Sequence, residues 1–128
     1  MIISEINKIF FVALGGAGQR HLRILKNLLP GSVEFSAYRS TNQTPLLNSD
    51  FSVSSNATID SQYDLTLFNS LEEGLDNDPD LIVISNPTSL HFEAAQKAAE
   101  RNINIFVEKP FSHNLDGFNE FENLILKN

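Results

Sequence analysis

The run Ala13-Leu14-Gly15-Gly16-Ala17-Gly18 constrains the fold of this chain more than any other segment. It ends an apolar stretch, about Lys8–Leu14, that reads as a strand covered on both faces. A helical pattern follows over about Ala17–Leu29, with leucines at helical spacing. A glycine-rich turn between a buried strand and a helix is typical of a parallel α/β sheet.

The rest of the chain repeats this alternation of strand and helix. A long polar stretch, Ser40 to about Gln62, reads as a loop with a short helix or strand inside it. The other expected strands are about Val33–Arg39, Asp64–Phe68, Asp80–Ser85 and Asn104–Glu108, and the other expected helices are a short one after Ser70, then about Ser89–Arg101 and Asn114–Leu126. This order predicts an α/β fold, a doubly wound parallel sheet of the Rossmann type, with residues 1–128 forming one domain.

Composition excludes several classes of partner and site. The formal net charge of −7 opposes binding to phosphate backbones and anionic lipids, so neither nucleic acid nor a membrane is expected as a partner. The chain has no cysteine, which removes disulfides and thiolate chemistry, and no metal site is expected. This composition fits a reducing cytoplasm. The apolar run at residues 9–14 is too short to span a bilayer.

The glycine turn itself predicts a bound dinucleotide. Gly15 lets the backbone approach a pyrophosphate, Gly16 and Ala17 lie in the same cradle, and Gly18 lets the helix pack closely on the strand. The N–H groups of the helix N-terminus face the phosphates. We expect Gly18→Val to abolish binding and leave the domain folded. The alternative is a glycine turn with no ligand. Ala13 replaces the usual first glycine.

The end of the second strand bears on the choice of cofactor. NAD sites place an Asp or Glu there for the ribose hydroxyls, whereas this chain reads Tyr38-Arg39-Ser40-Thr41. The Arg39 guanidinium can pair with a 2′-phosphate, and Ser40 and Thr41 can add hydrogen bonds. This pattern favours NADP over NAD. The alternative is that Arg39 is a solvated side chain at a strand end.

Two later segments complete a resemblance. One is Asp80-Leu81-Ile82-Val83-Ile84-Ser85-Asn86-Pro87-Thr88, followed by His91, and the other is Asn104-Ile105-Phe106-Val107-Glu108-Lys109-Pro110. Together with the turn and its continuation through Arg23, they resemble the glucose–fructose oxidoreductase, inositol dehydrogenase and rhizopine-catabolism family (Gfo/Idh/MocA). The resemblance implies an NAD(P)-dependent oxidoreductase that transfers hydride between the nicotinamide and a sugar or cyclitol hydroxyl or ketone.

The same resemblance implies roles for individual residues. Lys109 looks like the family's catalytic lysine beside the nicotinamide and the substrate hydroxyl, although it can also be read as a surface lysine. The expected cofactor-binding residues in this part of the chain are Asn86, Pro87, Thr88, His91 and Glu108. For His91 the alternative is that it only lines the first turn of its helix, and Glu108 is expected to be structural rather than catalytic.

The family also has parts that this sequence lacks. We expect the domain to be incomplete, ending before the sixth strand and the C-terminal substrate domain, so that the 128-residue chain alone is nearly inactive. An open edge on the fifth strand, with Phe118 and Phe121 exposed on the last helix, predicts self-association. A free-standing, non-catalytic dinucleotide-binding or sensor module is the alternative function. A methyltransferase fits less well, because it leaves Glu-Lys-Pro unexplained.

Overall fold

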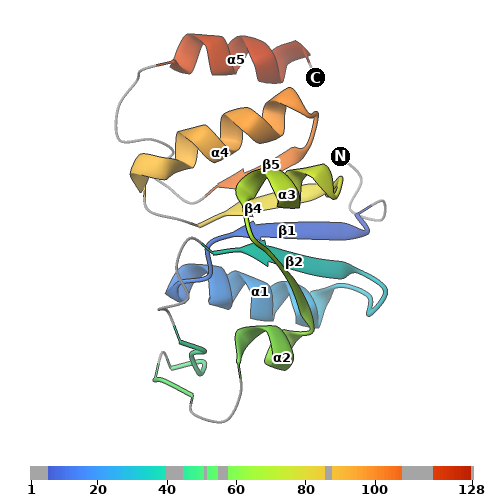
Figure 1. Cartoon of the computed structure of the whole chain (residues 1–128), viewed down its shortest axis with the longest axis vertical. Coiled ribbons are helices and arrows are strands. Elements are labelled where there is room, and N and C mark those ends of the chain that lie inside the picture. The colour runs from blue at the N-terminus through green and yellow to red at the C-terminus, as the bar shows by residue number, and fades with distance from the viewer. Residues whose placement is uncertain are drawn as a thin grey trace.

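A computed structural model describes residues 6–39, 45–50, 52–54, 58–85, 88–107 and 117–127, with only the backbone for residues 88–90 and 127. Its strands form one sheet in which every pairing is parallel, in the order β3-β2-β1-β4-β5 (Figure 1). They are β1 (Lys8–Val12), β2 (Glu34–Tyr38), β3 (Leu65–Phe68), β4 (Leu81–Ile84) and β5 (Asn104–Val107). The predicted Rossmann-type sheet is confirmed.

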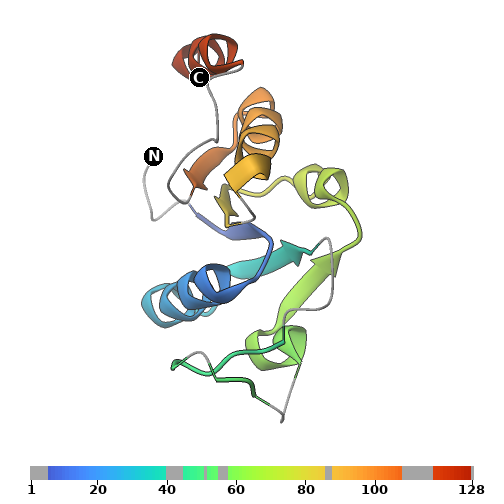
Figure 2. The same ribbon diagram turned by 90° about the vertical axis from the view of Figure 1, so that its left-hand side faces the viewer.

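The helices cover both faces of this sheet. They are α1 (Gly16–Leu28), α2 (Ile59–Tyr63), α3 (Leu71–Asp76), α4 (Thr88–Glu100) and α5 (Phe118–Lys127). Figure 2 shows α1 on one side of the sheet and α3 and α4 on the other. None of the helices in the described ranges is long and apolar enough to cross a membrane.

One predicted boundary needs correction, and the short helix or strand expected within the polar stretch is found. The first strand ends at Val12 rather than Leu14, because the backbone of Ala13 turns into the left-handed region with a φ of +72°. The polar stretch expected as a loop contains α2, which Thr58 and Ser61 cap reciprocally through their side chains and backbone N–H groups. It also contains an antiparallel bridge between Leu47 and Val53.

Two hydrophobic clusters, one on each face of the sheet, hold the layers together. Alternation along β1 sends Ile9 and Phe11 into the cluster beneath α1, and Phe10 and Val12 into the cluster beneath α3 and α4. Small side chains let α4 lie close to the sheet, and four alanines on this helix are buried: Ala94, Ala95, Ala98 and Ala99.

Helix α3 approaches the sheet even more closely. A Cβ atom at Gly74 would stand 2.0 Å from Cζ of Phe10, so only glycine fits above that ring. Ser70 caps this helix by accepting the N–H of Glu73 at 3.0 Å, at the start of the short helix predicted after Ser70. The Glu73 carboxylate, however, accepts the N–H of Asn69 rather than that of Ser70.

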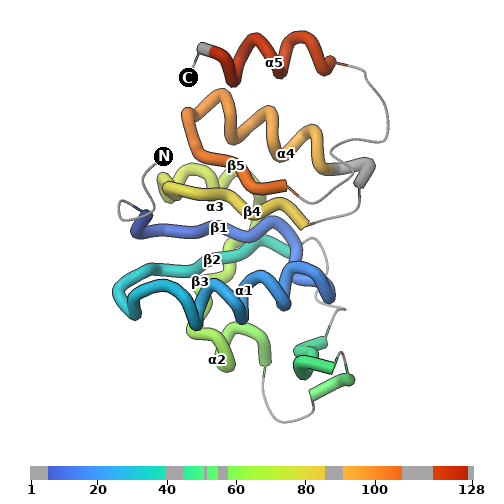
Figure 3. The backbone as a smooth tube through the Cα atoms, turned by 180° about the vertical axis from the view of Figure 1, so that it is seen from behind, coloured from blue at the N-terminus to red at the C-terminus, as the bar shows by residue number. Residues whose placement is uncertain are grey.

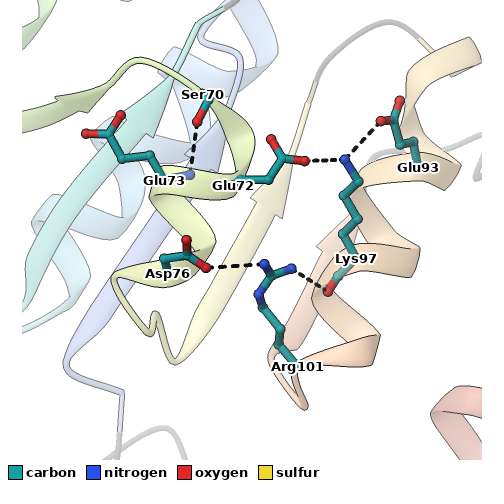
Figure 4. A network of polar contacts seen from close by, with 7 residues as sticks. All are labelled: Ser70, Glu72, Glu73, Asp76, Glu93, Lys97 and Arg101. Atoms are coloured by element: carbon teal, nitrogen blue, oxygen red, sulfur yellow. Dashed lines mark hydrogen bonds and ion pairs between the residues drawn. The ribbon is translucent and has the colours of Figure 1, made fainter.

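Charged side chains fasten α3 to α4 at the surface (Figure 4). The Lys97 ammonium pairs with Glu72 and also lies 3.2 Å from Glu93, and Arg101 pairs with Asp76 at 3.2 Å. The hydrogen bond between Glu72 and Lys97 lowers the pKa of the Glu72 carboxyl and raises the pKa of the Lys97 ammonium.

Candidate functional site

The strand register brings the ends of four strands into one row. Tyr38 pairs with Val12, Val12 with Ile84, and Ile84 with Val107. From β1 the chain passes through α1 to β2 on one side, and from β4 it passes through α4 to β5 on the other side. This is the topological switch point of an open α/β sheet, where ligands bind beyond the carboxyl ends of the strands.

The glycine turn is anchored at its first residue by both neighbouring strands. The Ala13 N–H donates to the Tyr38 carbonyl at 2.8 Å, and the Ser85 hydroxyl donates to the Ala13 carbonyl at 3.1 Å. These bonds help to hold Ala13 at its positive φ, a conformation that costs an L-residue energy and persists only when its surroundings fix it. The chain on both sides of the turn therefore fixes its shape.

Gly15 is the N-cap of α1 and leaves open space in front of the helix. A Cβ added there would meet no atom within 4 Å, glycine has no side chain with which to cap the helix, and the first turn of α1 contains no acid. The first N–H groups of a helix have no intrahelical acceptor, and they carry the positive end of its dipole. Gly16 and Ala17 form the first turn itself. This cradle fits a pyrophosphate.

Gly18 has the packing role predicted for it. A Cβ at this position would stand 2.6 Å from the Ser85 hydroxyl and 2.9 Å from the Ala13 carbonyl oxygen. A branched side chain at Gly18 would crowd the ends of β1 and β4, so we expect Gly18→Val to destabilise the domain as well as to disturb the turn, and whether it stays folded is a prediction still to be tested. Loss of binding in that variant would not separate a ligand contact from unfolding.

Arg39 lies directly after β2, in the same row as the glycine turn, and its side chain is partly buried. Burial lowers the pKa of the Arg39 guanidinium, and the carboxylate of Asp60 on α2 partly offsets that effect. Arg39 nevertheless stays cationic at neutral pH, because an arginine pKa starts far above it. The structure thus places a cation where NAD sites carry an acid. Ser40 and Thr41 lie outside the described residues.

The residues on the opposite side of the switch point are described only in part. Thr88 opens α4, and His91 is 2% exposed within the same helix. Such burial favours the interpretation that His91 packs in the helix, and its contact with a cofactor stays a prediction. The predicted residues Asn86, Pro87, Glu108 and Lys109 lie outside the described residues. Within the described ranges, no three potential ligand side chains gather as a metal site.

Sequence reasoning missed two polar side chains that shape this site. Ser85 fastens the ends of β1 and β4 through the Ala13 carbonyl, and Gln19, which is 1% exposed, hydrogen-bonds Leu14, Pro45 and Leu47. A serine directly after a predicted strand is a weak signal. The partners of Gln19 are up to 28 residues away, so no local pattern could have indicated them.

Comparison with known protein families identifies the family of this chain. Residues 8–127 match the model of an oxidoreductase family with an NAD-binding Rossmann fold, GFO_IDH_MocA. The chain belongs to this family. It is therefore an NAD(P)-binding oxidoreductase domain, as the sequence motifs predicted. No curated protein sequence matches it.

Solved structures share the same fold. They include myo-inositol 2-dehydrogenase from Lactobacillus plantarum, with a TM-score of 0.72 and 23% identity over 96% of this chain and 34% of that chain. Biliverdin reductase from Synechocystis sp. PCC 6803, in complex with biliverdin and NADP+, has a TM-score of 0.71 and 18% identity over 94% of this chain and 35% of that chain. The WlbA dehydrogenase from Chromobacterium violaceum, in complex with NADH and UDP-GlcNAcA, has a TM-score of 0.75 and 16% identity over 98% of this chain and 34% of that chain. The chain thus spans about a third of the length of these proteins.

Proposed function

We propose that this chain is the cofactor-binding domain of an NADP-preferring oxidoreductase that acts on a hydroxyl or ketone of a sugar or cyclitol. The observation that carries the preference is Arg39, a cation directly after β2 at the level of the glycine turn. A guanidinium can bind a 2′-phosphate in two-point fashion. The substrate class is supported by the motif resemblance and by relatives such as the inositol dehydrogenase, whereas biliverdin reductase shares only the fold.

Lys109 is the proposed catalytic residue, two positions after the end of β5. The nicotinamide, when bound, supplies the hydride acceptor or donor. In the oxidation of an alcohol, the substrate carbon loses hydride and its hydroxyl loses a proton. The Lys109 amine would bind that oxygen and take the proton, and the same group would return it in the reverse reaction. In a chain that includes the substrate domain, Lys109→Ala should lower turnover far more than cofactor affinity.

Paired calorimetric titrations with NADPH and NADH test the cofactor proposal. Wild type should bind both ligands, NADPH more tightly. Arg39→Ala should weaken NADPH far more than NADH, since a charge-assisted hydrogen bond contributes about 1.5–3 kcal/mol. Equal losses for both cofactors would refute the assignment of Arg39.

A glycine substitution tests the pyrophosphate cradle separately from the fold. Gly15→Ala should lower the melting temperature only slightly, because alanine is a poorer N-cap than glycine, and it should weaken both cofactors, because its Cβ would project into the open space of the cradle. Gly31→Ala is the matched control, since a Cβ there also meets nothing within 4 Å but lies in the turn after α1. Unchanged affinity in Gly15→Ala would remove the glycine turn from the site.

The proposal extends to the organisation and location of the chain. Residues 1–128 would bind the cofactor, and the substrate would be held by a further domain. The cysteine-free composition favours a cytoplasmic location.

Self-association is part of the same proposal. Among the described strands β5 pairs only with β4, and a cavity of about 410 Å³ beside β5 is lined mostly by apolar residues, including Ile105 and Phe121, together with Asn102 and Asn104. On α5, Phe118 is 40% exposed as expected, whereas Phe121 is only 6% exposed because it packs on Phe92. Sedimentation at low and high salt tests this, and a monomer at both salt concentrations would contradict it.

A further inference from the structure

The buried side-chain amide of Gln19 joins two segments that are distant in the sequence. Its Nε2 donates to the Leu14 carbonyl at 3.0 Å and to the Pro45 carbonyl at 2.9 Å. Its Oε1 accepts the Leu47 N–H at 2.7 Å. One side chain in the first turn of α1 thus binds both the glycine turn and the chain that follows β2.

The segment that Gln19 holds is a short hairpin, residues 45–50 and 52–54, which we call the 45–54 hairpin. Its arms are joined by the Asn48 N–H to the Ser52 carbonyl at 2.8 Å and by the Ser54 N–H to the Leu46 carbonyl at 2.9 Å. Leu46 is buried in the cluster that contains Leu14. Figures 1 and 3 both show the hairpin beside the end of α1 that carries the glycine turn.

The position of the hairpin assigns it to one end of a dinucleotide. A pyrophosphate on the glycine turn has its adenosine ribose toward the end of β2, and its nicotinamide on the other side of the switch point. The hairpin follows β2 and Arg39 in the chain and is anchored to the turn by Gln19. It therefore stands on the adenosine side.

We propose that Gln19 is a positioning residue for the adenosine end of the cofactor. It sets the place of the 45–54 hairpin relative to the glycine turn, and the hairpin forms a wall of the adenosine pocket. Gln19 touches no cofactor atom in this role. The inference rests on the proposed dinucleotide function and adds a residue and a segment that determine affinity for one half of the ligand.

The probe is 5′-ADP, which carries the adenosine and pyrophosphate but no nicotinamide. Gln19→Met keeps the length of the side chain and removes all three hydrogen bonds. It should weaken 5′-ADP on the order of tenfold, within the range typical of coupling between sites. Leu75→Ala is the control, because Leu75 is buried in the opposite cluster and its truncation destabilises the fold away from the hairpin. Well below its melting temperature, this control should bind 5′-ADP like wild type.

A second variant separates positioning from general damage. A protonated carboxyl in Gln19→Glu offers one donor and one acceptor, whereas the ionised form repels the carbonyl oxygens of Leu14 and Pro45. Its affinity for 5′-ADP relative to wild type should therefore rise as the pH falls from 8 to 5. The same ratio for Gln19→Met should stay flat. Hydrogen exchange of the Leu47 amide should accelerate in both variants at pH 8, normalised for intrinsic exchange.

Two results would overturn the positioning role. One is wild-type affinity in Gln19→Met. The other is an equal loss in Gln19→Met and in Leu75→Ala at matched melting temperatures, with no pH response in Gln19→Glu. A wild-type chain that does not bind 5′-ADP at all would refute the dinucleotide function itself, and the positioning role with it.

Discussion

Ala13 offers a direct test of how the glycine turn is held. It has a φ of +72°, and its N–H and carbonyl are fixed by Tyr38 and Ser85. The left-handed conformation costs an L-residue about 1–2 kcal/mol. Glycine avoids that cost but gives the unfolded chain extra freedom, which destabilises the fold by about 0.4–1 kcal/mol. The difference predicts that Ala13→Gly raises the free energy of unfolding by about 0.8 kcal/mol.

Thermal and urea denaturation measure this effect. A gain of that size should raise the melting temperature by about 2–5 °C in a domain of this length. Asn102→Gly is the control, because Asn102 has a φ of +59° and asparagine tolerates this region better than alanine does. Its gain should be smaller. The reasoning fails if Ala13→Gly is neutral or destabilising, or if Asn102→Gly stabilises the domain as much.

Three further predictions concern packing, cofactor choice and pH. Gly18→Ala should lower the free energy of unfolding by about 1–3 kcal/mol through overcrowding against Ser85, with Gly31→Ala near neutral, and equal urea midpoints for the two would contradict this. Asp60→Asn removes a carboxylate that attracts Arg39, so it should raise affinity for NADPH relative to NADH by about two- to fivefold. That gain should disappear in an Arg39→Ala background, and its persistence there would show that Asp60 does not act through Arg39. The lowered pKa of Glu72 means that its pairing with Lys97 stabilises the fold above the ordinary glutamate pKa and is lost as the pH falls through the lowered value. The urea midpoints of wild type and Glu72→Gln should therefore differ at pH 7 and converge below about pH 4.3, whereas a constant difference would show that charge is not the cause.

The sequence predicted those parts of the fold that depend on local pattern. Apolar runs such as Leu81–Ile84, short and rich in β-branched residues, are typical of strands covered on both faces, and the strand and helix on either side of the glycine turn were predicted from the same local patterns. The 45–54 hairpin was not predictable, because it is ordered by Gln19 and by burial of Leu46 rather than by its own periodicity.

Single backbone and packing events explain the other differences. The first strand was placed two residues too long because apolarity continues through Leu14, while the left-handed turn at Ala13 has no signal in a residue that seldom adopts it. Phe121 was expected to be exposed, and its contact with Phe92 depends on how α5 lies on α4. Arg39 was placed correctly from its position after a strand, but the influence of Asp60 depends on tertiary structure.

The closeness of Gly74 to the Phe10 ring has a consequence for the evolution of this domain. A methyl group at position 74 and a phenyl ring at position 10 cannot occupy the same space, so position 74 cannot gain a side chain while Phe10 keeps its place. Related sequences with a larger residue at position 74 should carry a smaller one at position 10, and the two columns of an alignment should covary although they stand 64 residues apart. A larger residue at position 74 alone would destabilise the domain, and it becomes tolerable only when a smaller residue replaces Phe10 in β1.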